Sequence, residues 1–350
     1  MRQAVLLGNP GTKRTVFMER AAEKTGVRVA FLDWKSWEEQ MPDTEVFLKI
    51  DPPLWDSSSL EELGSLVEEY KEKLTRLSYL EKKRSVVFLN HPSAIEALLD
   101  KRGCKDTLRR AGIPVTESLG SAGDMEQLTE IMDVCRMNQV FIKPVNGSGA
   151  AGVAAFRRQP KTGKMALYTC AADKDGRLIN TRRLRRFSEQ REIRYLLEKL
   201  LKLDCIVERW YAKETYQNMS YDLRAVMQDG KLDYLLARLS DGPVTNLHLN
   251  NHPLAPEELK LSVSVREKVK ALCRKAMACY PGLQSAGIDI LLEKDSRRPR
   301  IIEMNAQGDL IYRDIYNKNI IYCHQTEMMG RWLSEPLMAG RAELEKIEYE

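Results

Sequence analysis

The sequence contains no long apolar run. None of its 350 residues lies in a stretch that approaches the roughly 20 apolar residues needed to cross a bilayer. Its first apolar run, Ala4 to Leu7, is too short for the core of a secretory signal. The seven cysteines are scattered without a CxxC pair and histidines number four, so neither a disulfide framework nor a zinc site is indicated. We therefore expect a protein of the reducing cytoplasm with no membrane partner.

Neither positive nor negative residues are in large excess. Lys and Arg number 55 against 50 Asp and Glu, a net charge of +5, and no basic motif is interleaved with aromatic residues. Nucleic acid is therefore not an expected partner, although the small surplus is compatible with anionic ligands. A hydrophobic share of 43% and a charged share of 30% are ordinary for a soluble globular protein. The length suits two or three domains.

The first 90 or so residues alternate between apolar strands and helical stretches, which predicts an α/β domain with a parallel sheet. Its turn GNPGTKR lacks both the GxGxxG spacing of dinucleotide sites and the lysine pattern of a P-loop. We therefore expect this domain to hold substrate or to be architectural. Helices are expected at 15–24, 60–82, 189–203, 257–279 and 319–333. The predicted segments are an N-terminal α/β domain (1–90), a central α+β lobe (91–204), a C-terminal α+β lobe (205–335) and a charged tail (336–350).

The segment from Ser285 to Asn305 places three polar side chains among apolar ones. Asp289 points away from the apolar face of its strand, and Glu303 and Asn305 are two residues apart, so they share a face. The polar linker EKDSRRPR predicts a hairpin that brings the three together. Two carboxylates and an amide oxygen are ligands that suit Mg²⁺ beside nucleotide phosphates. A hairpin with a solvated polar face is the alternative.

A strand that ends at Lys143 runs directly into the glycine-rich loop at 146–152. Backbone N–H groups in such a loop approach an anion closely, and Lys143 adds a positive charge beside them. The pattern indicates a phosphate cradle, with a flexible hairpin and a solvated lysine as the alternative. The small residues that carry the argument are Gly147, Ser148, Gly149 and Gly152.

Arg224 and Arg238 sit on two strands joined at Asp229-Gly230, each flanked by apolar residues. Arginines in such a place suit a transferring phosphoryl group or a carboxylate. The alternative is a salt bridge with Asp222 or Asp241. A basic run at 182–186 is most simply a solvated face, with an anionic substrate or a lid contact as the other interpretation. The loop at 248–252, with two histidines, is expected to contact substrate.

The order of these motifs resembles that of the ATP-grasp superfamily, in particular the branch with ribosomal-protein glutamate ligase and bacterial glutathione synthetase. The resemblance covers roughly residues 90–315, and its most specific part runs from SYDLR to NLHLNN and on to GIDIL and EMNA. The remaining matching motifs are DK at 100–101, AGIPV at 111–115, FIKP with its glycine-rich loop, and VERWYAKE.

The resemblance implies a fold in which two α+β lobes clasp ATP, and it implies roles for individual residues. Lys101, otherwise an ordinary surface lysine, would contact ATP phosphates with Lys143, and the 147–152 loop would fold over them. Asp289, Glu303 and Asn305 would hold Mg²⁺, or Mn²⁺ in its place. Arg224 and Arg238 would face the γ-phosphate and an acyl phosphate. The residues expected around the nucleoside are Glu208, Arg209 and Tyr211 at the adenine hinge and Glu214 at the ribose, while Asn246 matches the family's asparagine in its NL motif.

Two segments depart from the family pattern: residues 249–251 after NLH, and Gln307-Gly308-Asp309 after EMNA. Both are expected where the acceptor substrate binds, so substrate identity does not transfer. The function implied is an ATP-dependent ligase that joins a carboxylate to an amine or thiol, on small-molecule or peptide substrates, through an acyl phosphate. A kinase of the same fold and a nucleotide sensor without turnover are the alternatives. A homo-oligomer is compatible with the sequence.

Overall fold

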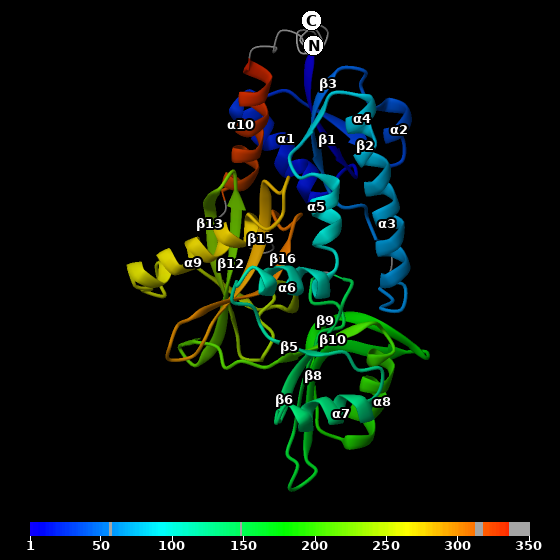
Figure 1. Ribbon diagram of the computed structural model, residues 1–350, viewed down its shortest axis with the longest axis vertical. Coiled ribbons are helices and arrows are strands. Elements are labelled where there is room, and N and C mark those ends of the chain that lie inside the picture. The colour runs from blue at the N-terminus through cyan, green and yellow to red at the C-terminus, as the bar shows by residue number, and fades with distance from the viewer. Residues whose placement is uncertain (56–57, 148, 312–317, 336–350) are drawn as a thin grey trace, which may run out of the picture.

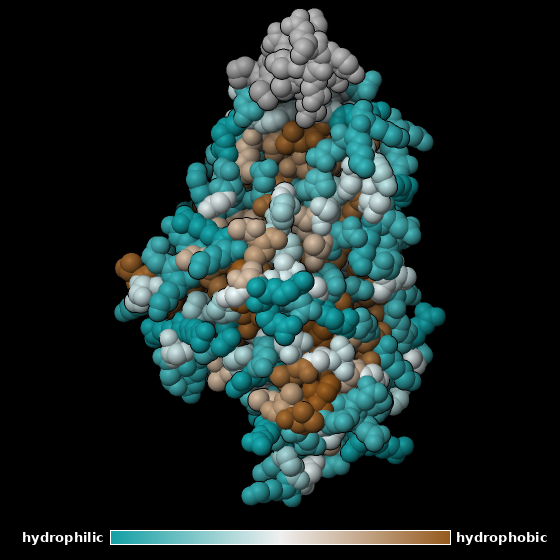
Figure 2. Space-filling view, in the orientation of Figure 1, coloured by the Kyte–Doolittle hydropathy of each residue, from teal (hydrophilic) through white to brown (hydrophobic). Residues whose placement is uncertain are grey.

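The structure is a computed structural model that describes residues 1–55, 58–147, 149–311 and 318–335. Figure 1 shows three bodies along the long axis: the N-terminal domain with the N-terminus at one extremity, the central lobe at the other, and the C-terminal lobe between them. The surface in Figure 2 is largely hydrophilic, with smaller hydrophobic patches. Among the described residues, no helix combines the length and the apolar composition needed to span a membrane.

The N-terminal domain has a four-stranded parallel sheet in the order β2-β1-β3-β4, which confirms the predicted parallel sheet. Its first helix begins where Thr12 accepts a hydrogen bond from the backbone N–H of Thr15 and ends at Gly26, whose φ of 71° suits a glycine cap. The elements of the domain are β1 (Arg2–Gly8), α1 (Lys13–Thr25), β2 (Val29–Asp33), α2 (Trp37–Gln40), β3 (Glu45–Ile50), α3 (Leu63–Ser78), α4 (Leu80–Lys83) and β4 (Val86–Phe88).

The central lobe has a six-stranded sheet in the order β5-β10-β6-β7-β8-β9, covered by α7 and α8. The segment before α3 joins this lobe, because the N–H of Leu60 donates to the carbonyl of Leu178. The helices α5 (Pro92–Ala97) and α6 (Lys101–Arg110) precede this lobe in the chain, and they pack in the core shared by the N-terminal domain and the C-terminal lobe. The elements of the lobe are β5 (Ser118–Gly120), α7 (Met125–Val134), β6 (Gln139–Pro144), β7 (Ala154–Arg158), β8 (Met165–Lys174), β9 (Arg177–Phe187), α8 (Gln190–Leu201) and β10 (Cys205–Arg209).

The C-terminal lobe has an antiparallel sheet in the order β14-β13-β12-β15-β16, with β11 paired to β12. Strands β15 and β16 pair as the predicted 285–305 hairpin. Helix α9 begins six residues later than expected, because Ser262 caps it by accepting from the N–H of Val265. The elements are β11 (Thr215–Tyr216), β12 (Met219–Gln228), β13 (Lys231–Ser240), the 3-10 helix η1 (Leu247–Leu249), β14 (His252–Leu254), α9 (Val263–Met277), β15 (Ser285–Leu292), β16 (Pro299–Asn305) and α10 (Ile320–Ser334).

Two features of the packing differ from the predicted segments. Strand β10 pairs with β5 and β6, so residues 205–209 belong to the central sheet and not to the C-terminal lobe, where the sequence placed them. Helix α10 returns to the N-terminal domain, where its residue Trp332 packs edge-to-face against Phe47 and accepts a hydrogen bond from Arg2 through its carbonyl. The largest apolar core accordingly includes residues of both the N-terminal domain and the C-terminal lobe. The predicted tail at 336–350 lies outside the described residues.

Candidate functional site

A row of charged side chains crosses four strands of the C-terminal lobe on one face. Strand register places Arg238 opposite Asp222, Arg224 opposite Asp289, and Asp289 opposite Glu303. Directly opposed residues of an antiparallel sheet project to the same side, so register alone gathers these five groups. Two neighbouring cavities open at this row, and we name them the lysine cavity and the arginine cavity.

The arginines hold Asp289 from two sides. Arg224 donates to Oδ1 of Asp289 at 2.5 Å, and Arg238 lies 3.0 Å from its Oδ2. Arg238 also forms a bidentate pair with Asp222 at 2.7 and 2.9 Å, so the alternative of a salt bridge with Asp222 is present together with the contact to the candidate metal ligand. Burial opposes ionisation of Asp289, but Arg238 and Arg224 lower its pKa to about 2. The carboxylate is therefore ionised at neutral pH.

A glycine makes room for Arg224. A Cβ on Gly287 would lie 2.4 Å from Nη2 of Arg224 and 2.4 Å from the carbonyl oxygen of Gly308. The same Nη2 donates to that carbonyl at 3.0 Å, so the guanidinium is clamped between strand β15 and the 307–309 segment. In the GID sequence at 287–289, the glycine thus leaves space for the Arg224 guanidinium and the aspartate supplies the carboxylate that it contacts.

The lysine cavity lies between the central and C-terminal sheets. At its base the buried carboxylate of Glu208 accepts from Lys143 at 2.8 Å and from Thr116 at 2.8 Å, and Lys105 lies 3.1 Å away. Although burial opposes it, the two ammonium groups hold the pKa of Glu208 below its ordinary value. The wall also carries Lys213, which donates to Thr245 at 2.9 Å. Burial lowers the pKa of Lys213 to about 8, in spite of nearby Asp222.

The arginine cavity lies between the C-terminal lobe and the N-terminal domain. Its lining includes Asp289, Glu303 and Asn305 of the predicted metal set, both predicted arginines, and also Arg14, His248 and Gln307. Five residues line both cavities, so the two are contiguous at the charged row. These shared residues are Ala150, Arg238, Asn246, Asp289 and Glu303.

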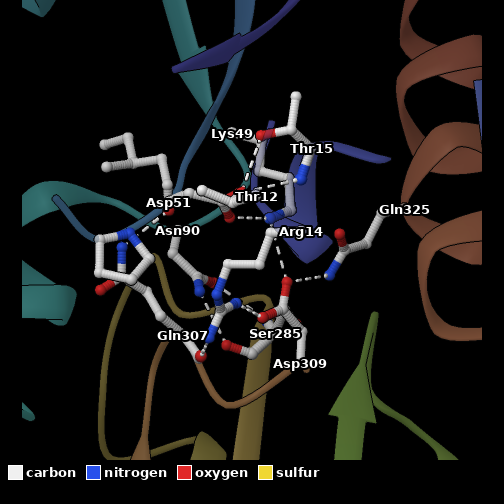
Figure 3. A network of polar contacts seen from close by, with 12 residues as sticks. Thr12, Arg14, Thr15, Lys49, Asp51, Asn90, Ser285, Gln307, Asp309 and Gln325 are labelled. Carbon is white, nitrogen blue, oxygen red and sulfur yellow. Dashed lines mark hydrogen bonds and ion pairs between the residues drawn. The ribbon is translucent and has the colours of Figure 1, made fainter. Parts of the chain in front are cut away.

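The wall of the arginine cavity from the N-terminal domain is held by a buried polar network (Figure 3). Arg14 forms a salt bridge with Asp309 and donates to the carbonyl of Gln307 at 2.8 Å, and Lys49 lies 3.0 Å from Asp309. Although burial opposes it, Lys49 and Arg14 hold the pKa of Asp309 well below its usual range. The departure at 307–309 therefore joins two bodies of the protein. Of this segment, only Gln307 and Gly308 line the cavity where an acceptor substrate was expected, while Asp309 joins the two bodies.

The glycine-rich loop takes backbone conformations that favour glycine. Gly147, Gly149 and Gly152 have φ values of 120°, 65° and 66°, and a Cβ on Gly152 would lie 2.7 Å from Cγ of Pro144. Gly149 lines the arginine cavity, whereas Ser148 lies outside the described residues. Lys101 donates to the carbonyl of Gly147 and lies 3.6 Å from Glu303, so it ties α6 to the loop and is not among the residues that line either cavity.

The expected hinge residues are only partly at the cavity. Arg209 and Tyr211 line the lysine cavity, and the N–H of Arg209 already donates to the carbonyl of Glu117. Glu214, expected at the ribose, is turned away: it accepts from the N–H of Asp295 and lies 3.5 Å from Arg297. Asn246 lines both cavities and caps η1 through the N–H of His248.

The sequence interpretation missed two lysines at the lysine cavity. Lys105, which follows Lys101 by one helical turn in DKRGCK, lines neither cavity but lies 3.1 Å from Glu208 at the base of the lysine cavity. Lys213 stands in the quoted motif VERWYAKE, but only register and burial reveal it as a cavity lysine. Residues 249–251 shape the loop instead of lining either cavity, since Leu249 is buried and Asn251 donates to the carbonyls of Val244 and Asn246.

Comparisons with known proteins concern the fold. No family model matches the chain, and no curated protein matches its sequence. Among solved structures, the ATP-grasp ligase PsnB complexed with a minimal precursor, Mg and ADP is similar, with a TM-score of 0.59, 16% identity, and coverage of 94% of this chain and 98% of PsnB. The macrocyclase MdnC from Microcystis aeruginosa MRC, bound with precursor peptide MdnA, has a TM-score of 0.58, 13% identity and coverage of 94% and 100%.

A third similar structure is D-alanine–D-alanine ligase from Bacillus anthracis complexed with ATP, with a TM-score of 0.53, 14% identity and coverage of 96% of this chain and 100% of that one. The likeness extends over nearly the whole chain in each comparison. The fold is therefore that of the ATP-grasp ligases. This likeness confirms the α/β fold expected from the motifs.

Proposed function

We propose that this protein is an ATP-dependent ligase that joins a carboxylate to an amine, or to a thiol, through an acyl phosphate and releases ADP and phosphate. The observation that carries the proposal is the continuity of the two cavities at Asp289, Glu303 and Arg238. A nucleotide in the lysine cavity would place its γ-phosphate at this junction. A carboxylate in the arginine cavity would then reach that phosphate from the other side.

The lysine cavity has the features that a nucleotide needs. Phe141, Leu291 and Ile302 offer apolar surface to a base, while Lys143 and Lys213 supply positive charge. Ala150 and Val153 bring the end of the glycine-rich loop to the same cavity.

The metal set fits Mg²⁺ by its donor chemistry, and Mn²⁺ would use the same ligands. Asp289 and Glu303 are opposed across β15 and β16, and Asn305 lies on the same cavity. Both oxygens of Asp289 accept arginine, yet each carboxylate oxygen keeps a second lone pair for a cation. When bound, the ion would neutralise charge on the transferring phosphoryl group. The described residues contain no cluster of three His, Cys, Asp or Glu, so Asn305 is a necessary member of the set.

Arg224 and Arg238 would bind the same developing charge from the side of the sheet. Each already presents its guanidinium to Asp289, so each needs little reorganisation to receive phosphate oxygens. The carboxylate oxygen of the substrate would attack the γ-phosphorus, and the P–O bond to ADP would break. An amine or thiol would then attack the acyl carbon and expel phosphate. No described side chain is required to form a covalent intermediate.

The substrates are proposed to be small molecules or peptides. PsnB and MdnC are complexed with precursor peptides, and D-alanine–D-alanine ligase acts by its name on a single amino acid, so the fold accommodates both sizes. A cytoplasmic location agrees with the free cysteines, most of which are buried, and a homo-oligomer remains a proposal from the sequence.

The test combines ATP, Mg²⁺ and hydroxylamine with pools of amino acids, dicarboxylates and short acidic peptides. A ligase activates a carboxylate, and hydroxylamine converts the acyl phosphate to a hydroxamate that mass spectrometry detects, with ADP formed only when a carboxylate is present. A stable phosphoester without free phosphate would identify a kinase. Binding of ATP without ADP formation in any pool would identify a sensor and contradict the proposal.

A further inference from the structure

The basic run at 182–186 lies on an exposed edge of the central sheet. Strand β9 is the last strand in the order of this sheet, beside β8, and its residues 178–180 also bond the 58–60 segment. None of the four arginines of the run forms a salt bridge with a carboxylate of the described chain, and Arg186 packs over the ring of Tyr168 at 5.9 Å. Four exposed cations without counter-charges are therefore available to an anion. The four residues are Arg182, Arg183, Arg185 and Arg186.

Two of these arginines leave the sheet. Thr169 pairs with Arg185 but Ala171 pairs with Asn180, so four residues of β9, 181–184, span one residue of β8 and bow outward. Leu184 anchors the bow in an apolar cluster with Val244 and Leu249, while Arg182 and Arg183 stay exposed.

The bow rests on the loop that closes the arginine cavity. Residues Asn246 and His248 of that loop line the cavity, and β9 contacts η1 within it. On its other side, Oδ1 of Asn180 accepts from the N–H of Gly152 in the glycine-rich loop at 3.5 Å. The bow therefore bridges two loops that carry lining residues of the arginine cavity, and Figure 1 shows β9 at the end of the central lobe that faces the other bodies.

The charges around the entrance are of one sign. Burial lowers the pKa of His248, and Arg224, Arg182, Arg238 and Lys13 lower it further, so Arg182 acts on a group that lines the cavity. The two carboxylates among the lining residues, Asp289 and Glu303, lie instead at the junction with the lysine cavity. The charged groups on the bow side of the cavity are therefore cations, and the carboxylates lie at its far end.

We propose that Arg182 and Arg183 form the entrance of the arginine cavity and select a substrate with at least two carboxylates, one that reaches the reaction site and one that stays on the bow. The assignment rests on the proposed function and adds the chemical class of the acceptor. Arg224 and Arg238 inside the cavity can bind one carboxylate, so Arg182 and Arg183 would strengthen the binding only of substrates that carry a second negative charge. A small dicarboxylate and an acidic peptide share this chemistry.

The experiment measures binding to the full chain by fluorescence anisotropy, with a short fluorescein-labelled polyglutamate peptide as the probe. Polyglutamine of the same length is the neutral comparison, and unlabelled glutarate and its monoamide glutaramate are the small competitors. We expect polyglutamate to bind more tightly than polyglutamine, with an affinity that falls as salt is raised. The double variant Arg182→Ala/Arg183→Ala should weaken that binding about threefold to thirtyfold, because two exposed ion pairs are lost.

The matched control is Arg191→Ala/Arg194→Ala on α8, which removes the same charge from exposed positions of the same lobe and should leave binding unchanged. Arg182→Lys/Arg183→Lys should restore most of the affinity. Competition by glutarate but not glutaramate would identify a small dicarboxylate, whereas binding of the peptide without competition by glutarate would identify an acidic peptide. Equal binding of polyglutamate and polyglutamine, or equal losses in the two alanine pairs, would overturn the proposal.

Affinity for MgATP is measured separately for every variant. If the wild-type chain does not bind MgATP, the proposed ligase function fails, whatever the peptide result. If MgATP binds and hydroxamate forms but the bow variant selects carboxylates as the wild type does, only the entrance assignment fails. Loss of MgATP affinity in the bow variant would place these arginines with the nucleotide, and this also contradicts the assignment.

Discussion

Replacing Lys143 should lower both stability and ATP affinity, and a second substitution should separate the two effects. Lys143 is buried, and its ammonium lies 2.8 Å from the fully buried carboxylate of Glu208. Lys143→Met keeps the apolar stem and removes the charge. A charge-assisted hydrogen bond contributes about 1.5–3 kcal/mol, and a buried charge left without a partner costs about 3–5 kcal/mol. Because Lys105 and Thr116 still contact Glu208, we expect a loss of about 2 kcal/mol, at the lower end.

Adding Glu208→Gln to Lys143→Met removes the carboxylate that the lysine neutralised. The free energy of unfolding should then recover only in part, because the carboxylate left by Lys143 is gone but the buried ammonium of Lys105 has lost the same partner. ATP affinity should stay about 10- to 100-fold weaker in both variants, since the ammonium near the phosphates is missing in both. Denaturant titration of the central lobe and calorimetric titration with ATP provide the two measurements.

The pH dependence gives an independent check with a defined sign. The folded pKa of Glu208 lies below its ordinary value of 4.5, so its stabilisation is present above pH 4.5 and is lost as pH falls through the folded pKa. The stability difference between Lys143→Met and the wild type should shrink over the same window. Lys174→Met, at an exposed strand end of the same lobe, is the control and should change neither quantity. A folded Lys143→Met protein with wild-type ATP affinity would refute the reasoning.

Three further changes test the charged row and its surroundings. Glu303→Gln should abolish Mg²⁺-dependent turnover and leave the apoprotein equally or more stable, as a metal titration and thermal melts would show; turnover at the wild-type rate would make the residue structural. Gly287→Ala should displace Arg224 or residue 308, lower the free energy of unfolding by about 1–3 kcal/mol and remove most of kcat. The control Gly64→Ala, with open space around it, should change neither quantity, and an active, stable Gly287→Ala protein would contradict the clamp. The kcat/KM for ATP should fall as pH rises through about 8, because Lys213 loses its proton there, and Lys213→Arg should flatten that step. The free energy of unfolding of the apoprotein should instead rise between about pH 8 and 10.5, because the unfolded chain still holds the proton that the folded chain has lost.

The fold could be predicted because local patterns and motif order agree. Alternation of strands and helices gave the parallel sheet, and the apolar pattern with a polar linker gave the 285–305 hairpin. The spacing of Glu303 and Asn305, two apart on one strand, placed both on the arginine cavity without knowledge of register. Boundaries were less accurate, because a strand such as β10 carries no local mark of the sheet it joins.

The partners of the charged groups could not be predicted, since they come from elements far apart in the chain. The sequence predicted Lys143 only as a lysine at a strand end beside an anion, whereas the structure pairs it with Glu208, which is 65 residues away in the chain. Glu214 was assigned to the nucleotide by motif position, yet the turn around Asp295 captures its side chain instead. Motif order fixes which backbone passes the cavity, but the rotamer and the competing partner decide which side chain faces it.

The departure at residues 307–309 shows how one segment serves the fold and the site together. Asp309 is buried against Arg14 and Lys49 of the N-terminal domain, and Arg14 in turn lines the arginine cavity. Removing one partner of a buried charge network is costly, so this segment cannot change to suit a new substrate without changes in α1 and β3 as well. The entrance bow has no such constraint, because its arginines are exposed and without described carboxylate partners. Selection among acceptors is therefore more readily altered at the bow than at the segment that joins the domains.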